Sequence, residues 1–255
     1  MRVIIHRDAE AATRAVSAFF AEQLAAKPAS VLGLATGGTM EGVYAELIEL
    51  YRAGKMSFAK ARSFNLDEYL GLPADHPQTY RHYMDERLFR HVDFPPNATH
   101  LPDGTSADPE KAAEDYEALI ARYGPIDLQL LGLGANGHIG FNEPSSSLGS
   151  RTRIKTLTHA TIEANGRFFE DGEWQPHQAL TMGIATILDA RSVLVLAFGA
   201  GKAEAVAQVV EGPISARWPG TALQMHRHAT LVLDEAAASD LTMRDYYQWV
   251  QANDG

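Results

Sequence analysis

The chain has 255 residues, of which 45% are hydrophobic and 21% charged, and it contains no cysteine. This composition is ordinary for a globular protein, and the absence of cysteine excludes disulfides, thiolate nucleophiles and zinc–thiolate sites. The net charge of −10 argues against nucleic acid or an anionic membrane as a general partner. Because the N-terminus is charged and no apolar run could span a bilayer, we expect a soluble, cytoplasmic protein.

The first third of the chain contains a pattern that suits a bound phosphate. Residues 2–6 and 30–34 are short apolar runs that predict strands, with an amphipathic helix between them. The second run leads into Gly37-Gly38-Thr39 and then into another helix. Backbone N–H groups and the helix dipole would point at an anion there. The alternative is a tight turn that needs glycine only for its geometry.

The third predicted strand, residues 61–66, places two acids at its end, Asp67 and Glu68. Adjacent acids in such a position are often merely solvated. A carboxylate beside a phosphate-binding loop is nevertheless well placed to act as a general base, so Asp67 is a catalytic candidate. Helices are expected over residues 79–90 and 109–123.

A glycine-rich loop follows the predicted strand 126–131 and carries His138 and Glu143 five positions apart. Ligands bind at the carboxyl ends of strands in open α/β sheets, and a histidine needs a partner to fix its tautomer before it can transfer protons. The loop is therefore the predicted active site. Residues 132–137 also match the dinucleotide pattern, but the following residues are poor helix formers, and one histidine with one glutamate is too few ligands for a metal.

In the second half of the chain, every second residue of one segment is a cation: Arg151, Arg153 and Lys155. Because alternate side chains of a strand point to the same side, these three cations would lie on one face of a predicted strand. That face could form a second anion site or an interface, or it could be a solvated edge. A polar loop over 170–177 could belong to a lid. We expect a helix over 179–188, a strand over 192–198, and Lys202 at the start of a helix as a phosphate ligand.

Strands and helices alternate without a repeat or a linker. This order predicts a single α/β domain over residues 1–255, with an open, mainly parallel Rossmann-like sheet and helices on both faces.

Several motifs together resemble those of the glucosamine-6-phosphate deaminases, also called glucosamine-6-phosphate isomerases, over nearly the whole chain. They are LATGGT (34–39), FNLDEYLGL (64–72), GHIGFNEP (137–144), SRTRIKTL (150–157), ANGRFF (164–169) and Lys202. The resemblance implies conversion of D-glucosamine 6-phosphate into D-fructose 6-phosphate and ammonia in amino-sugar catabolism, without a metal or cofactor. It led us to expect a hydrolase that is an amino-sugar isomerase and deaminase.

The resemblance also implies roles for individual residues. Asp67 would be the enolisation base and His138 the ring-opening acid and base, supported by Glu143 and Asn136. The phosphate would be held by residues of three segments: Gly37, Gly38, Thr39, Arg167 and Lys202. Asn136 stands where many members have aspartate. A neutral amide could orient the imidazole but would stabilise imidazolium less than a carboxylate does.

Some members of that family are hexamers activated by N-acetylglucosamine 6-phosphate at a subunit interface. The matching positions here are Ser146, Arg153, Lys155 and Thr156. The resemblance therefore raises the expectation of a homo-oligomer with an activator site. A 6-phosphogluconolactonase-like hydrolase and a galactosamine-6-phosphate isomerase or deaminase are the alternative functions. A catalytically silent phosphosugar sensor would be expected to lack Asp67 or His138.

Overall fold

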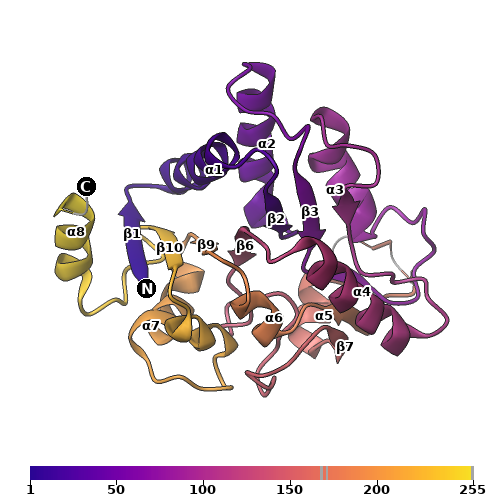
Figure 1. Ribbon diagram of the computed structural model, residues 1–255. Helices are drawn as coiled ribbons and strands as arrows, with labels where there is room; N and C mark the ends of the chain where they lie inside the picture. The colour runs from indigo at the N-terminus through magenta and orange to yellow at the C-terminus, as the bar shows by residue number, and fades with distance from the viewer. Residues whose placement is uncertain (167–168, 171, 254–255) are drawn as a thin grey trace.

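A seven-stranded sheet in which every pairing is parallel dominates the computed structural model, which describes residues 1–166, 169–170 and 172–253 (Figure 1). The strand order is β1-β10-β9-β6-β2-β3-β5. The strands are Arg2–His6 (β1), Val31–Leu34 (β2), Arg62–Asn65 (β3), Thr99–His100 (β5), Leu128–Gly132 (β6), Val193–Ala197 (β9) and Ala229–Asp234 (β10). The predicted open, mainly parallel α/β fold is confirmed.

Helices lie on both sides of the row of strands in Figure 1. They are Ala9–Ala26 (α1), Gly38–Arg52 (α2), Tyr80–Arg87 (α3), Pro109–Tyr123 (α4), His159–Gly166 (α5), Ile184–Leu188 (α6), Ala203–Glu211 (α7) and Arg244–Asn253 (α8), with 3-10 turns at Phe89–His91, Ala200–Lys202 and Pro219–Met225. Asp8 and Asp108 accept hydrogen bonds from the first turns of α1 and α4, as their positions predict. No helix in the described ranges is long and apolar enough to cross a membrane.

The core lies between the parallel sheet and these helices. Strands β6 and β9 are apolar along most of their length because both faces of the sheet are covered. Phe20 from α1 and Tyr44 from α2 are fully buried, together with Leu130 and Val195 from the sheet. This core supports the loops that follow the strands.

A second, antiparallel sheet corrects one of our predictions. Its order is β4-β8-β7, formed by Asp67–Tyr69 (β4), Gln178–Thr181 (β8) and Arg153–Thr156 (β7). We predicted one helix over 179–188, but the first part of that segment is the central strand of this sheet and only Ile184–Leu188 is helical. Pairing with strands distant in the sequence outweighed local propensity there.

The basic segment also differs from its prediction. Strand β7 begins at Arg153, so only Arg153 and Lys155 share a strand face. Arg151 lies before the strand and pairs with Asp189. Because β7 is at the edge of the three-stranded sheet, the alternative of a charged edge strand is consistent with the structure.

The parallel sheet determines where a functional site can form. The loops that follow β2, β3, β6 and β9 all leave from the same carboxyl edge, because these strands run in one direction. Those loops carry the predicted phosphate loop, Asp67, the His138 loop and Lys202.

Candidate active site

The loop after β6 is shaped around the His138 ring. A Cβ atom on Gly134 would lie 2.5 Å from three atoms of that ring, so only glycine fits beneath the imidazole. Gly137 has a φ of 77°, a conformation that favours glycine, and a Cβ there would lie 2.7 Å from Trp218. No helix follows this turn, because Ile139 bridges to Asn142 instead. The loop therefore lacks the helix that dinucleotide binding requires.

His138 lies beside the Glu143 carboxylate, with Nδ1 3.4 Å from Glu143 Oε2. That contact is at ion-pair distance without hydrogen-bond geometry, since Nδ1 has no hydrogen-bond partner among the described residues. Glu143 is almost completely buried, whereas about a quarter of the His138 side chain is exposed. The exposed ring can therefore meet a ligand while its partner stays shielded from water.

The Glu143 carboxylate is strongly held in its ionised form. Burial raises its pKa, but His138 and hydrogen bonds from Thr161 and Asn136 together outweigh that effect and lower the pKa to about 2. The ionised glutamate places a negative charge 3.4 Å from Nδ1 of His138. The pair is therefore suited to transferring a proton to and from a ligand.

Asn136 orients the glutamate, which differs from the predicted contact with the imidazole ring. Its Nδ2 donates to Glu143 Oε2 at 2.8 Å, and its Oδ1 accepts from the backbone N–H of His138 at 3.2 Å. An aspartate could not donate that first hydrogen bond while ionised. Asparagine at this position therefore fits a buried, ionised Glu143.

Asp67 is 5% exposed and lies close to the His138–Glu143 loop. Its Oδ2 is 3.4 Å from the place that a Cβ on Gly140 would occupy. Burial, with the charge of Glu68 adding to it, raises the pKa of Asp67 to about 8.

Glu68 has a structural role, in contrast to the neighbouring Asp67. Its carboxylate accepts hydrogen bonds from the backbone N–H groups of Tyr69, Tyr80 and Arg81. These contacts hold the first turn of α3 against β4. The two adjacent acids are thus divided between a helix cap and a candidate base.

Two tyrosines that the sequence did not single out connect Asp67 with the predicted phosphate loop. Tyr80 hydrogen-bonds through its hydroxyl to Tyr69, at 3.2 Å, and to Thr36. Tyr83 donates to the carbonyl oxygen of Gly37 at 2.9 Å. In the sequence, the aromatic residues of α3 indicate only packing against the core. Nothing around them predicted that they would connect Asp67 with the phosphate loop.

The predicted phosphate ligands lie on loops at this edge of the sheet. Gly37, with a φ of 102°, precedes the first residue of α2, Gly38, and Thr39 lies in its first turn. Lys202 follows β9, the neighbour of β6, and burial of its side chain lowers the pKa of its amine. Arg167 lies outside the described residues.

The residues matched to an activator site lie next to the candidate active site. Arg153 donates from Nη1 to Asn142 Oδ1 at 2.9 Å, one residue before Glu143. Ser146 is buried, and its hydroxyl has no hydrogen-bond partner in the described part of the chain. Lys155 is half-buried and Thr156 is exposed.

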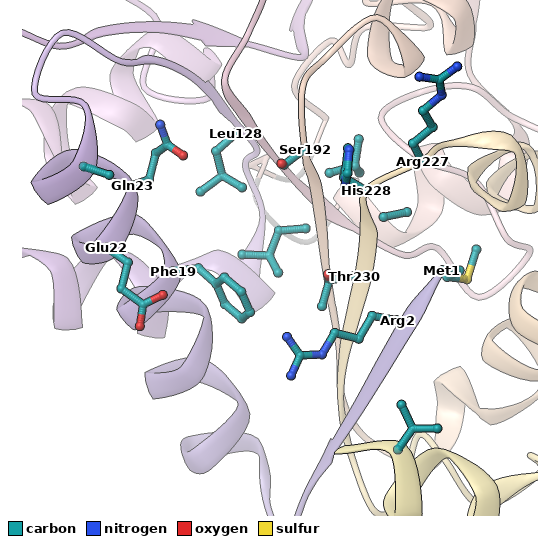
Figure 2. A pocket seen from close by; sticks show the side chains of 15 residues that line it. Met1, Arg2, Phe19, Glu22, Gln23, Leu128, Ser192, Arg227, His228 and Thr230 are labelled. Carbon is teal, nitrogen blue, oxygen red and sulfur yellow. The ribbon is translucent and has the colours of Figure 1, made fainter. Parts of the chain in front are cut away.

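A site in the cavity at the opposite edge of the sheet and a metal site both have less support. A cavity of about 680 Å³ lies where β6, β9 and β10 begin, at the edge opposite the His138 loop, and Figure 2 shows Arg2, Phe19 and His228 around it. None of the predicted site residues lines it. Among the described residues no group of three or more His, Asp or Glu side chains could hold a metal.

The residues of this candidate site lie within the part of the chain that a protein-family model matches. The model of the glucosamine-6-phosphate isomerases/6-phosphogluconolactonase family matches residues 7–232. The chain belongs to this family. Within it, the chain is 54% identical over 251 residues to a glucosamine-6-phosphate deaminase of Cellvibrio japonicus, covering 98% of this chain and 95% of the relative. It is 56% identical over 237 residues to one of Rhodopirellula baltica, covering 93% and 94%.

Solved structures separate the two branches of the family. A monomeric glucosamine-6-phosphate deaminase matches with a TM-score of 0.91 and 44% identity, over 94% of this chain and all of that one. The 6-phosphogluconolactonase of Trypanosoma brucei matches with a TM-score of 0.75 but only 21% identity, over 94% and 98%, which establishes the shared fold alone. The relatives' names support the deaminase and isomerase branch, and they give no support to the predicted hydrolase class.

Proposed function

We propose that this protein is a glucosamine-6-phosphate deaminase, which converts D-glucosamine 6-phosphate into D-fructose 6-phosphate and ammonia. The observation that carries the proposal is the pairing of two different proton-transfer groups at one edge of the sheet. A buried carboxyl with a pKa of about 8, Asp67, lies against a loop that holds His138 beside an ionised Glu143. The full-length relatives at 54% identity support the same reaction.

Each group has one task in this reaction. His138 gives a proton to the ring oxygen of the sugar and takes up the proton of the anomeric hydroxyl, which opens the ring to the aldehyde. Asp67 then removes the C2 proton while a proton passes from the C2 ammonium to the aldehyde oxygen, which gives an enolamine. Asp67 returns its proton to C1, and the product is a C2 iminium at the ketose level. Water adds to C2, the C–N bond breaks, and ammonia is released together with the ketone, fructose 6-phosphate. Burial of Asp67 suits the middle step, because a base with a raised pKa accepts the weakly acidic C2 proton more readily.

The test of this proposal compares the two branches of the family. We expect the purified protein to release ammonia from glucosamine 6-phosphate and to leave the spontaneous hydrolysis of 6-phosphogluconolactone unaccelerated. Rapid lactone hydrolysis without ammonia release would instead assign the chain to the lactonase branch. Galactosamine 6-phosphate is the second comparison, since it differs only at C4.

The phosphate is proposed to bind between the glycine loop and Lys202. We expect Lys202→Met to raise KM for glucosamine 6-phosphate by about 10- to 100-fold with a much smaller change in kcat, because a charged hydrogen bond far from C2 is lost. Steady-state kinetics would measure both constants. The matched control is Lys60→Met at an exposed position, for which we expect wild-type values. An unchanged KM in the Lys202 variant would remove this lysine from the phosphate site.

A second anion site at Ser146, Arg153, Lys155 and Thr156 is also proposed, for N-acetylglucosamine 6-phosphate. Its support is the Ser146 hydroxyl, which has no hydrogen-bond partner among the described residues, and the contact of Arg153 with Asn142, next to Glu143. We expect sigmoidal rate curves that become hyperbolic when this sugar is added. Hyperbolic curves without the activator would contradict the proposal. The structural relative is described as monomeric, so sedimentation of the protein with and without the sugar belongs to the same experiment.

A further inference from the structure

Two threonine hydroxyls at the start of α5 meet one oxygen of the Glu143 carboxylate. Thr161 donates from Oγ1 to Glu143 Oε1, Thr158 Oγ1 lies 3.4 Å from the same oxygen, and the two hydroxyls are 3.0 Å apart. The other oxygen, Oε2, faces Asn136 and His138. The carboxylate is thus held at one oxygen by α5, while its other oxygen is turned toward the imidazole.

The two threonines also build the first turn of that helix. Thr158 accepts from the N–H of Thr161 at 3.3 Å through its hydroxyl, and from the N–H of Ile162 at 2.9 Å through its carbonyl oxygen. Helix α5 lies in the connection between β7 and β8. Later in this connection Glu173 Oε1 contacts His76 Nε2 at 2.8 Å. The connection is therefore fastened to the Glu143 carboxylate at its start and to the loop after β4 near its end.

Among the residues that the structure describes, few charged groups act on Glu143. His138 lies on the same loop as Glu143. Lys155 on β7 is the second charged group. Burial and the charge of Arg153 lower the pKa of Lys155, and the charge of Glu143 acts in the opposite direction. The other groups that contact the carboxylate, Asn136 and the two threonines, are neutral. Of the two threonines, Thr161 makes the shorter contact with Oε1 and is therefore the neutral donor that chiefly holds this oxygen.

We propose that Thr161 is a positioning residue that keeps Oε2 of the ionised Glu143 aimed at His138 and makes this alignment depend on the placement of α5. The inference rests on the proposed function, because it assigns Thr161 a part in the ring-opening step. A carboxylate with one fixed oxygen cannot rotate about its terminal torsion, which is otherwise soft. Displacement of α5 would remove this restraint from the proton-transfer pair.

The test uses two substitutions at one position. Thr161→Val keeps the shape of the side chain and removes the hydroxyl, and we expect kcat to fall about tenfold with KM within about twofold. The loss of a donor destabilises the ionised carboxylate, so the Glu143 pKa should rise. Thr161→Ser keeps a hydroxyl and should restore most of the activity and the wild-type pKa of Glu143.

A second measurement does not depend on turnover. NMR titration of ¹³C-labelled glutamate carboxyls, with Glu143 assigned through Glu143→Gln, should report protonation of Glu143 at higher pH in Thr161→Val than in the wild type. Thr242→Val is the matched control, because Thr242 donates to Glu211 at 2.7 Å on the exposed surface. It should leave both the rates and the Glu143 titration unchanged.

The outcomes separate this inference from the proposed function. A Glu143 titration that is unchanged in Thr161→Val would overturn the positioning role. A loss of activity that Thr161→Ser fails to restore would overturn it too, since the hydroxyl would then be irrelevant. A wild type that releases no ammonia would refute the proposed function, and the titration would still decide whether Thr161 holds the carboxylate.

Discussion

Asp67→Asn should lower kcat for glucosamine 6-phosphate by about 10³-fold, within the range that removal of a general base produces. Asparagine keeps the size of the side chain but cannot accept the C2 proton. Steady-state ammonia release would measure the loss. Binding of the corresponding aminohexitol 6-phosphate, which has no ring and no acidic C2 proton, should stay within about threefold of the wild type. Near-wild-type turnover would remove Asp67 from the role of base.

The raised pKa of Asp67 gives this prediction a pH dependence. A carboxyl with a pKa of about 8 is mostly protonated at neutral pH, so wild-type kcat/KM should increase as the pH rises toward 8 and then level off. The control is Asp240→Asn at an exposed position, which should keep the wild-type profile. A profile that is flat between pH 6 and 9 would contradict the assignment of Asp67 as the base.

The same substitution provides a check on folding. Since the folded-state pKa of Asp67 lies above its unfolded value, its contribution to the free energy of unfolding is fully present below pH of about 4 and is lost as the pH rises toward 8. Asparagine carries no charge to desolvate. We therefore expect the stability of Asp67→Asn relative to the wild type to increase by about 5 kcal/mol as the pH rises from 4 to 8, as measured by urea denaturation. Lost activity would then not result from unfolding.

His138→Gln should lower kcat by about 10²-fold or more, because the ring-opening step loses its acid and base. Glutamine can still make a hydrogen bond but cannot transfer a proton at neutral pH. The deficit should be greater for turnover of the closed-ring substrate than for exchange of the C1 hydrogens of fructose 6-phosphate with deuterium oxide in the presence of ammonium. That exchange draws on the open-chain ketose already present in solution and reports Asp67.

Two comparisons make the His138 result interpretable. His91→Gln removes an exposed imidazole outside the loop and should behave as the wild type. The aminohexitol phosphate should bind His138→Gln normally. Wild-type turnover of glucosamine 6-phosphate by His138→Gln would contradict the ring-opening role, and an equal loss of turnover and exchange would place His138 in enolisation instead.

The sequence predicted most of the parallel sheet because apolar runs and glycine turns determine it locally. The strand before Gly37 and the strand before the His138 loop each ended where expected, within one or two residues. The antiparallel sheet was missed since β8 owes its conformation to pairing with Asp67–Tyr69 and Arg153–Thr156, which are far away in the sequence. No window around residues 178–181 contains that information.

The candidate site was predictable to the extent that short motifs carry it. Asp67, His138 and Glu143 were identified from the chain, and the structure places them around one loop. The orientation of Asn136 toward Glu143 and the role of Thr161 were not predictable. Both depend on which oxygen of a buried carboxylate faces which neighbour, and that is fixed by tertiary packing rather than by spacing.

The most direct test of the proposed reaction is the product balance of the purified, metal-stripped protein with glucosamine 6-phosphate, with galactosamine 6-phosphate beside it. The account predicts equal amounts of ammonia and fructose 6-phosphate from the gluco substrate. Release from the gluco substrate alone would also establish selectivity at C4. No ammonia from either sugar, despite tight binding of both, would contradict the deaminase proposal and leave a phosphosugar-binding site without this chemistry.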